Sequence, residues 1–488
     1  MALLEVAQAQ QETERLSQAL MIRRPDIEKR MNYLTGETGR LRFASEKFKE
    51  RFHQRYAGFV DNWCAPVVEA VGERMVYLGI RPAGSTSADS ELSRAWEAAG
   101  ADSGIQEALA VRSAAGRAFG MVSPSDRADR PRITFEHPEL TIVDEDPATG
   151  HRRYALIMWA DDKFEYATLY TPDQVWKFQR KTSEDRAQRQ GQPVELGSGW
   201  EPRRYNTDDT WPARNPFKQV PIVELKNRSF LRPEDPISEI SGVMAMQDAI
   251  NLTWAYLLNA LDMVSLPQRI ITGADVPEMP ILDKDGQIVG SRPVDLDMLT
   301  AEKILWINSD EAKPHEWSSA QIAPFLDVTQ QAVEHIAAQT RTPPHYLSGK
   351  MVNTAAEALT ISEAGLVSRA RQSILFVNQD IRQLNQLVAN AMGRDQRSID
   401  AIGAGVPVWA DPQYRSDAQR ADALLKKKQL GYPMKYLLEQ DGLPPHEIDR
   451  VMAMIREEQQ QDPLGVINRM ATTGALIDAG SEADPDEI

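Results

Sequence analysis

Arg341-Thr-Pro-Pro-His-Tyr-Leu-Ser-Gly-Lys-Met-Val-Asn353 is a short polar segment that runs into a long stretch without proline, ending at Gly393. The stretch opens with Thr354-Ala-Ala-Glu357, a capping box whose hydroxyl and carboxylate satisfy N–H groups at a helix N-terminus. A glycine is typical of a helix C-terminus. We therefore predict one helix of roughly 38 residues, about 57 Å long. Such a rod indicates a large or multimeric molecule, because helices in compact domains are usually far shorter.

The side chains of this predicted helix divide into two faces. Two adjacent prolines are expected to hold Arg341 to Pro344 extended, which favours a projecting loop between two helices over a packed connector. A long helix lying across its own domain is the alternative interpretation. The apolar stripe, at steps of three and four, is Leu366, Ala370, Ile374, Val377, Ile381, Leu384 and Val388, and the polar face is Ser368, Arg371, Gln372, Gln379, Arg382 and Gln386.

The order of these motifs resembles that of a known family. Thr342-Pro-Pro-His-Tyr-Leu347, then Asn353-Thr-Ala-Ala-Glu-Ala-Leu359 and a long helix, resemble the tunnel loop and following helix of tailed-bacteriophage portal proteins. Those proteins are the head-to-tail connectors through which DNA enters and leaves the capsid. Each motif alone is modestly specific, and their order carries the resemblance, which covers most of the chain.

Composition sets further limits on the class of protein. A chain of 488 residues is too long for one ordinary core, so two or more domains are expected. A net charge of −16 argues against a protein built to grip nucleic acid, but it allows DNA as a transient passenger. The single cysteine, Cys64, excludes an intrachain disulfide and is expected to be a small buried apolar residue.

No membrane or secretion signal is expected. The N-terminus lacks a basic region ahead of its apolar residues. The most apolar helical stretch, 251–264, is interrupted by Asn259 and Asp262 and is too short to span a bilayer. The chain is therefore expected to be soluble and intracellular.

The first half of the chain changes from helical to strand patterns. Residues 1–110 are predicted to be mostly helical, and the Asp146-Pro-Ala-Thr-Gly150 segment has turn chemistry. Asp144 and Asp146 are interpreted as turn residues rather than metal ligands. The predicted helices include 66–79 and 108–119, the predicted strands are 133–135, 140–143, 154–159 and 164–170, and residues 180–191 are predicted to be a flexible surface loop.

A helix is predicted to start at Asp235-Pro236 and to continue to residue 264. It is apolar nearly all round, so it must be covered on more than one face, by ring neighbours or by a large monomeric core. Strands are then predicted at 269–272, 287–289 and 303–307, with a hairpin turn at Asp285-Gly286. Calcium is rejected for Asp283-Lys-Asp-Gly286 because the later ligands of a calcium loop are missing.

The C-terminal part resembles the portal crown. Trp409-Ala-Asp-Pro412 starts a helical group that Gly431-Tyr-Pro433 breaks, and Leu443-Pro-Pro445 starts the next helix, which ends near Gln461. Lys426 to Lys428 are interpreted as the solvated end of a helix, with phosphate binding as the alternative. The acidic tail 462–488 is predicted to be disordered.

The motifs of common enzymes are missing. A phosphate loop ending at Lys350 would need glycine where Pro344 stands and a hydroxyl where Met351 stands. Neither His-Glu-x-x-His nor Gly-x-Ser-x-Gly occurs, and the seven histidines are scattered singly. The chain is therefore predicted not to be an enzyme and to have no catalytic, cofactor-binding or metal-binding residues.

The resemblance implies an α+β, mainly helical portal fold with a β-rich wing, a small β clip, and long stem and crown helices. Helix, small β insertion, helix, Pro-Pro loop and long helix is the portal order. The implied segments are the wing (1–235), a stem helix (236–264), the clip (265–320), a second stem helix (321–340), the tunnel loop (341–353), the long helix with its connection between wing and crown (354–410), the crown helices (411–461) and the tail (462–488).

The resemblance also implies a function. About twelve copies would form a closed ring at one capsid vertex, through which double-stranded DNA is packaged and ejected. The implied partners are the major capsid protein, the large packaging ATPase subunit, head-completion proteins and the passing DNA, with no membrane, and assembly would occur in the host cytoplasm. A DNA-processing enzyme (packaging ATPase or nuclease) and another capsid or scaffold component are the alternatives. The implied channel residues are Arg341, His345, Ser348, Lys350 and Asn353, and the implied docking residues are Lys284, Asp285, Gly286 and Gln287.

Overall fold

The computed structural model divides the chain into two units, which are described separately. Unit 1 comprises Met1–Asn32, Pro66–Ser241 and Met351–Ile488, and unit 2 comprises Tyr33–Ala65 and Gly242–Lys350. The structure describes residues 3–38, 41, 44–50, 59–127, 130–181, 199–204, 210–232, 234–265, 269–272, 278–282, 287–293, 304–307, 315–316, 321–348, 356–413 and 415–461.

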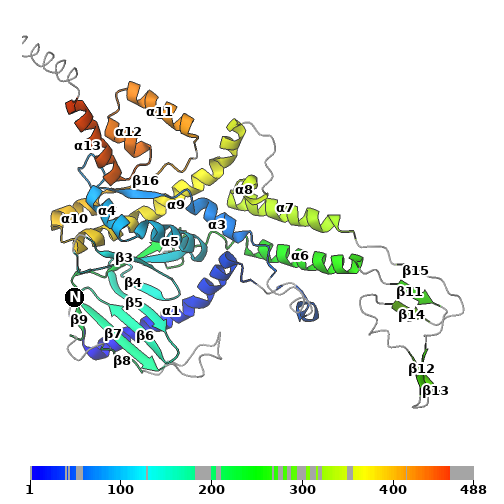
Figure 1. Ribbon diagram of the computed structural model, residues 1–488. Coiled ribbons are helices and arrows are strands. Elements are labelled where there is room, and N and C mark those ends of the chain that lie inside the picture. The colour runs from blue at the N-terminus through cyan, green and yellow to red at the C-terminus, as the bar shows by residue number, and fades with distance from the viewer. Residues whose placement is uncertain are drawn as a thin grey trace, which may run out of the picture. The chain divides into compact units, whose positions relative to one another are not determined.

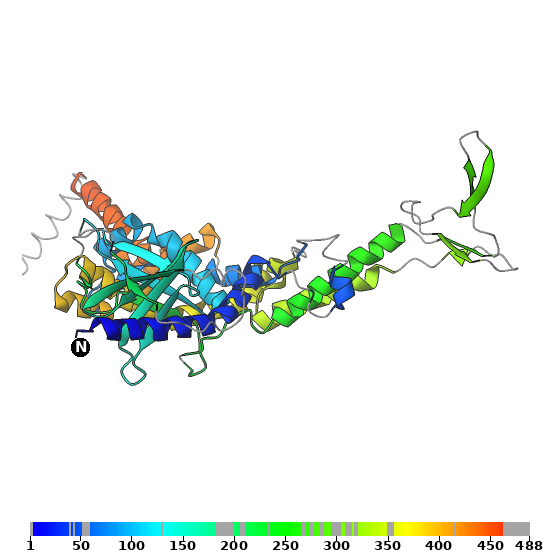
Figure 2. The same cartoon turned by 90° about the horizontal axis from the view of Figure 1, so that it is seen from below.

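An antiparallel sheet of six strands forms one half of unit 1 (Figure 1). Along its face lies helix α1 (Val6–Thr35), as Figure 2 shows, and Leu16 and Leu20 of α1 are buried against Leu156, Leu169 and Trp176. The strand order is β4 (Thr141–Glu145), β5 (Arg152–Ala160), β6 (Phe164–Tyr170), β7 (Gln174–Lys181) and β8 (Glu201–Pro202), with β9 (Ala213–Arg214) also paired to β7.

A second, three-stranded sheet stands beside the first and shares its core. Phe119 and Ile222 from this sheet pack with Val143 and Ala155 of the first. Two helices, α4 (Ser90–Ala98) and α5 (Ala101–Ala115), precede it in the chain. Its antiparallel order is β10 (Ile222–Lys226), β2 (Arg117–Ser123) and β3 (Arg132–Glu136), and a separate antiparallel pair joins β1 (Tyr77–Arg81) to β16 (Val406–Trp409).

The predicted long helix is present as α9 (Ala356–Ala391). Its predicted apolar stripe is confirmed, because Leu366, Ala370, Val377 and Ile381 and the later members are buried, with Ile374 partly exposed. The helix packs on β2 and β10. The remaining helices of unit 1 are α10 (Gln396–Gly403), α11 (Asp417–Gln429), α12 (Met434–Gln440) and α13 (Pro445–Gln461), and α3 (Cys64–Gly72) crosses the boundary between the units.

Unit 2 contains two packed helices and several short strands. Helix α6 (Met244–Ser265) packs against α7 (Ala323–Thr340), and the short helix α8 (Pro344–Ser348) follows α7. Strand β11 (Arg269–Thr272) pairs in parallel with β14 (Ile304–Ile307) and antiparallel with β15 (His315–Glu316), while β12 (Glu278–Leu282) and β13 (Ile288–Pro293) form a hairpin.

The α+β fold class, the mainly helical character and the strands expected between residues 133 and 170 are confirmed. The predicted strands near 269, 288 and 304 are also present. In the part of the chain that the structure describes, no helix is long and apolar enough to cross a bilayer. The N-cap Thr354 of the predicted capping box, the Asp285-Gly286 turn, nearly all of loop 180–191 and the tail 462–488 lie outside the described residues.

The predicted start of a helix at Pro236 is wrong, because α6 begins at Met244. Hydrogen bonds to other segments hold the chain before Met244 in turns. The backbone N–H of Ile237 donates to Arg228, the N–H of Glu239 donates to Ser113, and the side chain of Asn227 donates to the Ile237 carbonyl. These tertiary bonds override the local Asp-Pro signal.

Three further boundaries differ from expectation. The predicted helix 66–79 ends at Gly72, and Tyr77–Arg81 is a strand because it pairs with β16. The predicted helix 108–119 ends at Ala115, where Gly116 adopts a φ of 92° and β2 begins. Arg341 is not extended: it has φ 52° and ψ 30° at the end of α7.

Candidate functional site

Helix α6 is covered in part from within its own chain. Ile250 and Leu257 are buried, whereas Tyr256 is 40 % exposed and Leu252, Trp254 and Leu258 are half-buried. A segment from 41 to 50 contributes Leu41 and Ala44 to a cluster with Ala255 of α6. The chain's own core therefore covers part of α6, which is one of the two kinds of cover expected from the sequence.

Polar contacts attach residues 61–64 to α6. The Asp61 carboxylate Oδ2 accepts the indole N–H groups of Trp63, at 3.0 Å, and Trp254, at 2.7 Å. The backbone N–H of Trp63 donates to Gln247 Oε1 at 2.7 Å. Cys64, next in the chain, is fully buried, and burial raises the pKa of its thiol to about 12. The small buried role expected for Cys64 is confirmed.

The segment after α7 contains the predicted channel residues. Arg341 occupies the left-handed position of a Schellman turn, in which Thr342 N–H donates to Ala337 O at 3.0 Å and Arg341 N–H to Ala338 O at 3.3 Å. Glycine usually fills this position because a side chain there costs about 1–2 kcal/mol. Arg341 is exposed, whereas Thr342 and Leu347 are buried.

The structure brings two of the five predicted channel residues close together. Arg341 and His345 both lie at the junction of α7 and α8, and the His345 and Tyr346 rings are 5.0 Å apart. Ser348 is the last residue of α8. Lys350 and Asn353 lie outside the described residues.

Of the predicted docking residues, only Gln287 is described, and it is exposed next to β13. Lys284, Asp285 and Gly286 lie outside the described residues. The β12–β13 hairpin has apolar side chains in solvent: Ile281 is 46 % exposed, Ile288 70 % and Val289 68 %. A two-stranded hairpin by itself is only marginally stable in water, because it buries little apolar surface.

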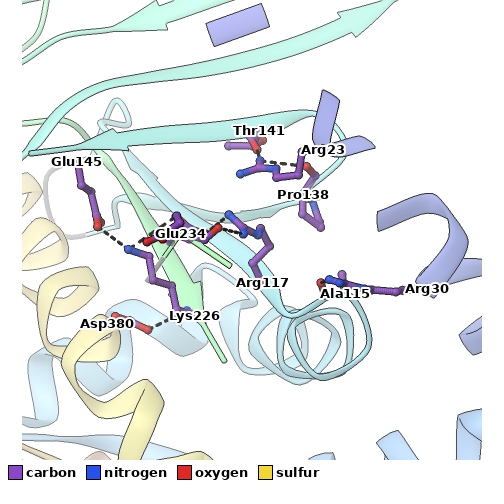
Figure 3. A network of polar contacts seen from close by, with 11 residues as sticks. Arg23, Arg30, Ala115, Arg117, Pro138, Thr141, Glu145, Lys226, Glu234 and Asp380 are labelled. Carbon is purple, nitrogen blue, oxygen red and sulfur yellow. Dashed lines mark hydrogen bonds and ion pairs between the residues drawn. The ribbon is translucent and has the colours of Figure 1, made fainter. Parts of the chain in front are cut away.

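A network of polar and charged groups connects β2, β4, β10 and α9 of unit 1 (Figure 3). Arg117 of β2 donates from Nη1 to Glu224 Oε1 and from Nη2 to the Glu234 carbonyl, both at 2.8 Å. Lys226 of β10 forms an ion pair with Glu145 of β4. Asp380 of α9 accepts the backbone N–H of Lys226 at 3.0 Å. The network therefore joins both sheets to the long helix.

Arg112 adds a further link between β10 and α9. Its side chain is fully buried, and it donates from Nε to the Lys226 carbonyl at 2.9 Å and from Nη1 to Ser373 Oγ at 2.8 Å. Burial lowers the pKa of Arg112 to about 10, so it stays protonated near neutral pH. Burial also raises the pKa of Asp380 to about 7, against the opposing effect of the Lys226 N–H. Sequence patterns gave no sign of this network, because its members come from distant segments.

The carboxylates near the β4–β5 turn have structural roles. Asp144 forms ion pairs with Arg15, at 3.1 Å, and Arg153, at 3.0 Å. Asp146 accepts the N–H of Ala148 at 2.8 Å, and this bond lowers the pKa of its carboxyl. Within the described ranges, no group of three His, Cys, Asp or Glu side chains is placed to hold a metal ion.

Comparison with known proteins identifies the family. The family model described as phage portal protein, SPP1 Gp6-like, matches residues 15–461, which is most of the chain. The chain belongs to this family of phage portal proteins. The resemblance seen in the sequence is therefore confirmed, and the portal family is one of structural proteins rather than enzymes.

Two portal relatives are similar over most of their length. The portal protein of Mycobacterium phage D29 is 27 % identical over 373 residues, which cover 74 % of this chain and 70 % of the relative. The portal protein of Mycobacterium phage L5 is 27 % identical over 377 residues, with the same two coverages.

The chain also aligns with solved particle structures at low similarity. One is the neck of a native gene transfer agent particle computed with C12 symmetry, at 14 % identity and a TM-score of 0.39, covering 85 % of this chain and 99 % of that one. Another is the virion of a native gene transfer agent particle, at 13 % identity and a TM-score of 0.36, covering 86 % and 94 % of the two chains.

Proposed function

We propose that this portal chain assembles into a closed ring of about twelve copies at one capsid vertex, through which double-stranded DNA is packaged and ejected. Family membership and the order α6, short strands, α7, α8 and α9 support this function. The alternatives, a DNA-processing enzyme and another capsid or scaffold component, account for neither observation.

Ring closure needs a surface that the chain itself leaves open. Helix α9 provides one: Ile361 is 75 % exposed, Leu375 69 % and Phe376 41 %. These large apolar side chains on a helix favour burial against a neighbouring subunit. Light scattering on the purified protein should give a mass near that of a dodecamer, and end-on negative-stain images should show rings. A stable monomer that stays monomeric inside particles contradicts the proposal.

The segments take the roles that the portal family suggests. Residues 1–235 form the wing, α6 and α7 the stem, 354–410 the long helix and its connection to the crown, and 411–461 the crown. The strands between 265 and 320 form the clip, which docks the large packaging ATPase subunit and later the head-completion proteins through the loop from Lys284 to Gln287. The wing and crown face the capsid interior, where the major capsid protein surrounds the vertex. Assembly takes place in the host cytoplasm.

The clip role has a direct test. Replacing residues 265–320 by a short Gly-Ser linker should leave unit 1 folded and abolish packaging, because the linker keeps the reach of the segment without its binding surface. The circular dichroism and melting of unit 1 serve as the control. Normal DNA packaging by such particles would exclude this role.

The segment 341–353 forms the tunnel loop, with Arg341, His345, Ser348, Lys350 and Asn353 facing the passing DNA. The Schellman turn at Arg341 supports this, since it ends α7 sharply and leaves the arginine exposed. Removing Ser348 to Val352 should leave rings intact and impair packaging or retention of DNA.

A labelling experiment tests the same loop without shortening it. Cysteine replaces Ser348, and the buried Cys64 is replaced as well. The new thiol should be protected from a bulky reagent when DNA fills the particle and exposed when the particle is empty. Cysteine at Ser85, an exposed residue of unit 1, is the matched control. Equal labelling of full and empty particles, with normal packaging by the shortened loop, places the segment outside the channel.

A further inference from the structure

The segment 425–436 is positively charged, whereas the chain as a whole is negatively charged. It contains Lys426, Lys427, Lys428 and Lys435 and no aspartate or glutamate, whereas the whole chain has a net charge of −16. It joins the last turn of α11 to the first turns of α12. This concentration of positive charge is called the lysine patch below and consists of these four lysines.

A tight turn fixes the patch in place. Gly431 N–H donates to the Lys428 carbonyl at 3.0 Å and Tyr432 N–H to the Lys427 carbonyl at 3.2 Å, which is the pattern of a Schellman motif. Gly431 has a φ of 92°, a conformation that side chains disfavour. The turn therefore sets Tyr432 directly beside the end of the lysine run.

Two tyrosines continue the patch on the next helix. The rings of Tyr432 and Tyr436 stack with centroids 5.4 Å apart and an interplanar angle of 24°. Both rings remain exposed, Tyr432 by 45 % and Tyr436 by 37 %. Their phenol groups are hydrogen-bond donors of the kind that contact phosphate oxygens in DNA complexes.

The contacts that the chain itself makes with the patch lie at the surface, and one of them is the Lys427 amine donating to Gln440 Oε1 at 3.4 Å. Helix α11 has no buried residue. The Lys426 amine pairs with Asp422 at 2.7 Å, but the two side chains are 70 % and 60 % exposed. Lys435 pairs with Asp449 at 2.9 Å, with exposures of 40 % and 47 %. Exposed pairs of this kind contribute little, so a phosphate can replace the carboxylate at small cost.

We propose that the lysine patch, with Tyr432 and Tyr436, binds the phosphate backbone of duplex DNA. Lysine ammonium groups are mobile point charges that bind phosphate without a fixed geometry, which suits a ligand of any sequence. The patch belongs to α11 and α12 and shares no residue with the segment 341–353, so it does not depend on the channel proposed above. It would hold DNA beside the crown helices rather than guide its passage.

The strength of one patch follows from the counterion effect. Four phosphate contacts give a slope of log K against log salt of roughly −3.6. One such patch binds weakly near physiological salt. Several patches on one oligomer would raise the apparent affinity, because later contacts become intramolecular.

Fluorescence anisotropy with a labelled 30-base-pair duplex and the full-length purified protein tests the proposal at 50 to 200 mM salt. The variant K426Q/K427Q/K428Q should weaken binding by at least about tenfold at 50 mM salt and should make the salt slope shallower by about 2–3. The charge-preserving variant K426R/K427R/K428R should bind like the wild type. The control K163Q/K181Q/K218Q removes three lysines of the β-sheet region that are exposed and should leave affinity within about twofold.

Three results would overturn the proposal. The first is an unchanged affinity and slope in the patch variant, and the second is an equal loss in the control. The third is displacement of the duplex by polyglutamate as efficiently as by unlabelled duplex, which would assign the patch to an acidic protein surface. If the triple variant does not fold, the single exposed substitution K428Q should still reduce the salt slope by about 1.

Discussion

The buried ion pair between Arg117 and Glu224 gives the sharpest test of the fold. The side chains are 9 % and 5 % exposed, and their closest atoms are 2.8 Å apart. Replacing Arg117 by methionine removes the cation that lies nearest to the buried Glu224 carboxylate and leaves Lys226, 4.0 Å away, and Arg23 as the positive charges that act on it. Removing one partner of a buried pair costs about 3–5 kcal/mol. The Glu234 carbonyl also loses its donor.

This loss is measurable by calorimetry. A cost of 3–5 kcal/mol corresponds to a fall in Tm of roughly 10 °C for a large domain. Because the chain has two units, the comparison uses the transition of unit 1 rather than a single unfolding free energy. R117M should lower that transition, whereas R132M, at an exposed arginine of β3, should leave it within about 2 °C.

A double variant separates the pair from the packing around it. R117M/E224M replaces both charges by apolar side chains and should recover most of the lost stability, because no unpaired carboxylate remains. The reasoning fails if R117M melts with the R132M control, or if the double variant is as unstable as the sum of its two single variants.

Three further outcomes are expected. L384A should destabilise unit 1 by about 2–5 kcal/mol in urea unfolding, because Leu384 is fully buried, while I22A at an exposed position of α1 should change it by less than about 0.5. The pKa of Asp380 is raised to about 7, so the folded chain binds this proton more tightly and loses stability as the pH rises toward 7. The Tm of D380N minus the Tm of the wild type should therefore increase from pH 5 to pH 8. A difference that does not change with pH would contradict the raised pKa of Asp380. Cys64, with a thiol pKa of about 12, should react with a thiol reagent at pH 8 only after unfolding in urea.

The parts of the fold that could be predicted are those that local patterns determine. The apolar stripe from Leu366 to Val388 predicted the buried face of α9, because these residues recur with the 3.6-residue period of an α-helix. The strands from β3 to β6 followed from short apolar runs separated by turn residues.

The errors have a common physical cause, which is contact with distant segments. Tyr77–Arg81 has helical spacing, yet it becomes a strand because Val406–Trp409 offers a partner. The Asp235-Pro236 signal is overridden by bonds to Asn227, Arg228 and Ser113. The strand partner of Tyr77–Arg81 and the hydrogen-bond partners of the segment after Pro236 are distant in the sequence, so local patterns do not predict them.

The candidate site was predicted in part. The proline pair correctly predicted that α7 ends before it. Proline restricts only the residue directly before it, which is Thr342. Arg341 can therefore adopt the left-handed conformation that ends α7. The charged network around Lys226 and Asp380 could not be predicted, because each of its members has ordinary polar neighbours in the sequence. Only the folded sheets bring them together.

The pairing of β1 with β16 has a consequence for the order of synthesis. Strand β1 is translated early, but its partner Val406–Trp409 leaves the ribosome only after most of the chain has been made. Until then Tyr77–Arg81 has no strand partner, and α9, which packs on β2 and β10, is also missing. Unit 1 therefore cannot complete its fold until Val406–Trp409 has left the ribosome. A subunit gains the β1–β16 pair and the packing of α9 only late in its synthesis, after the helices and strands of its first half have been made.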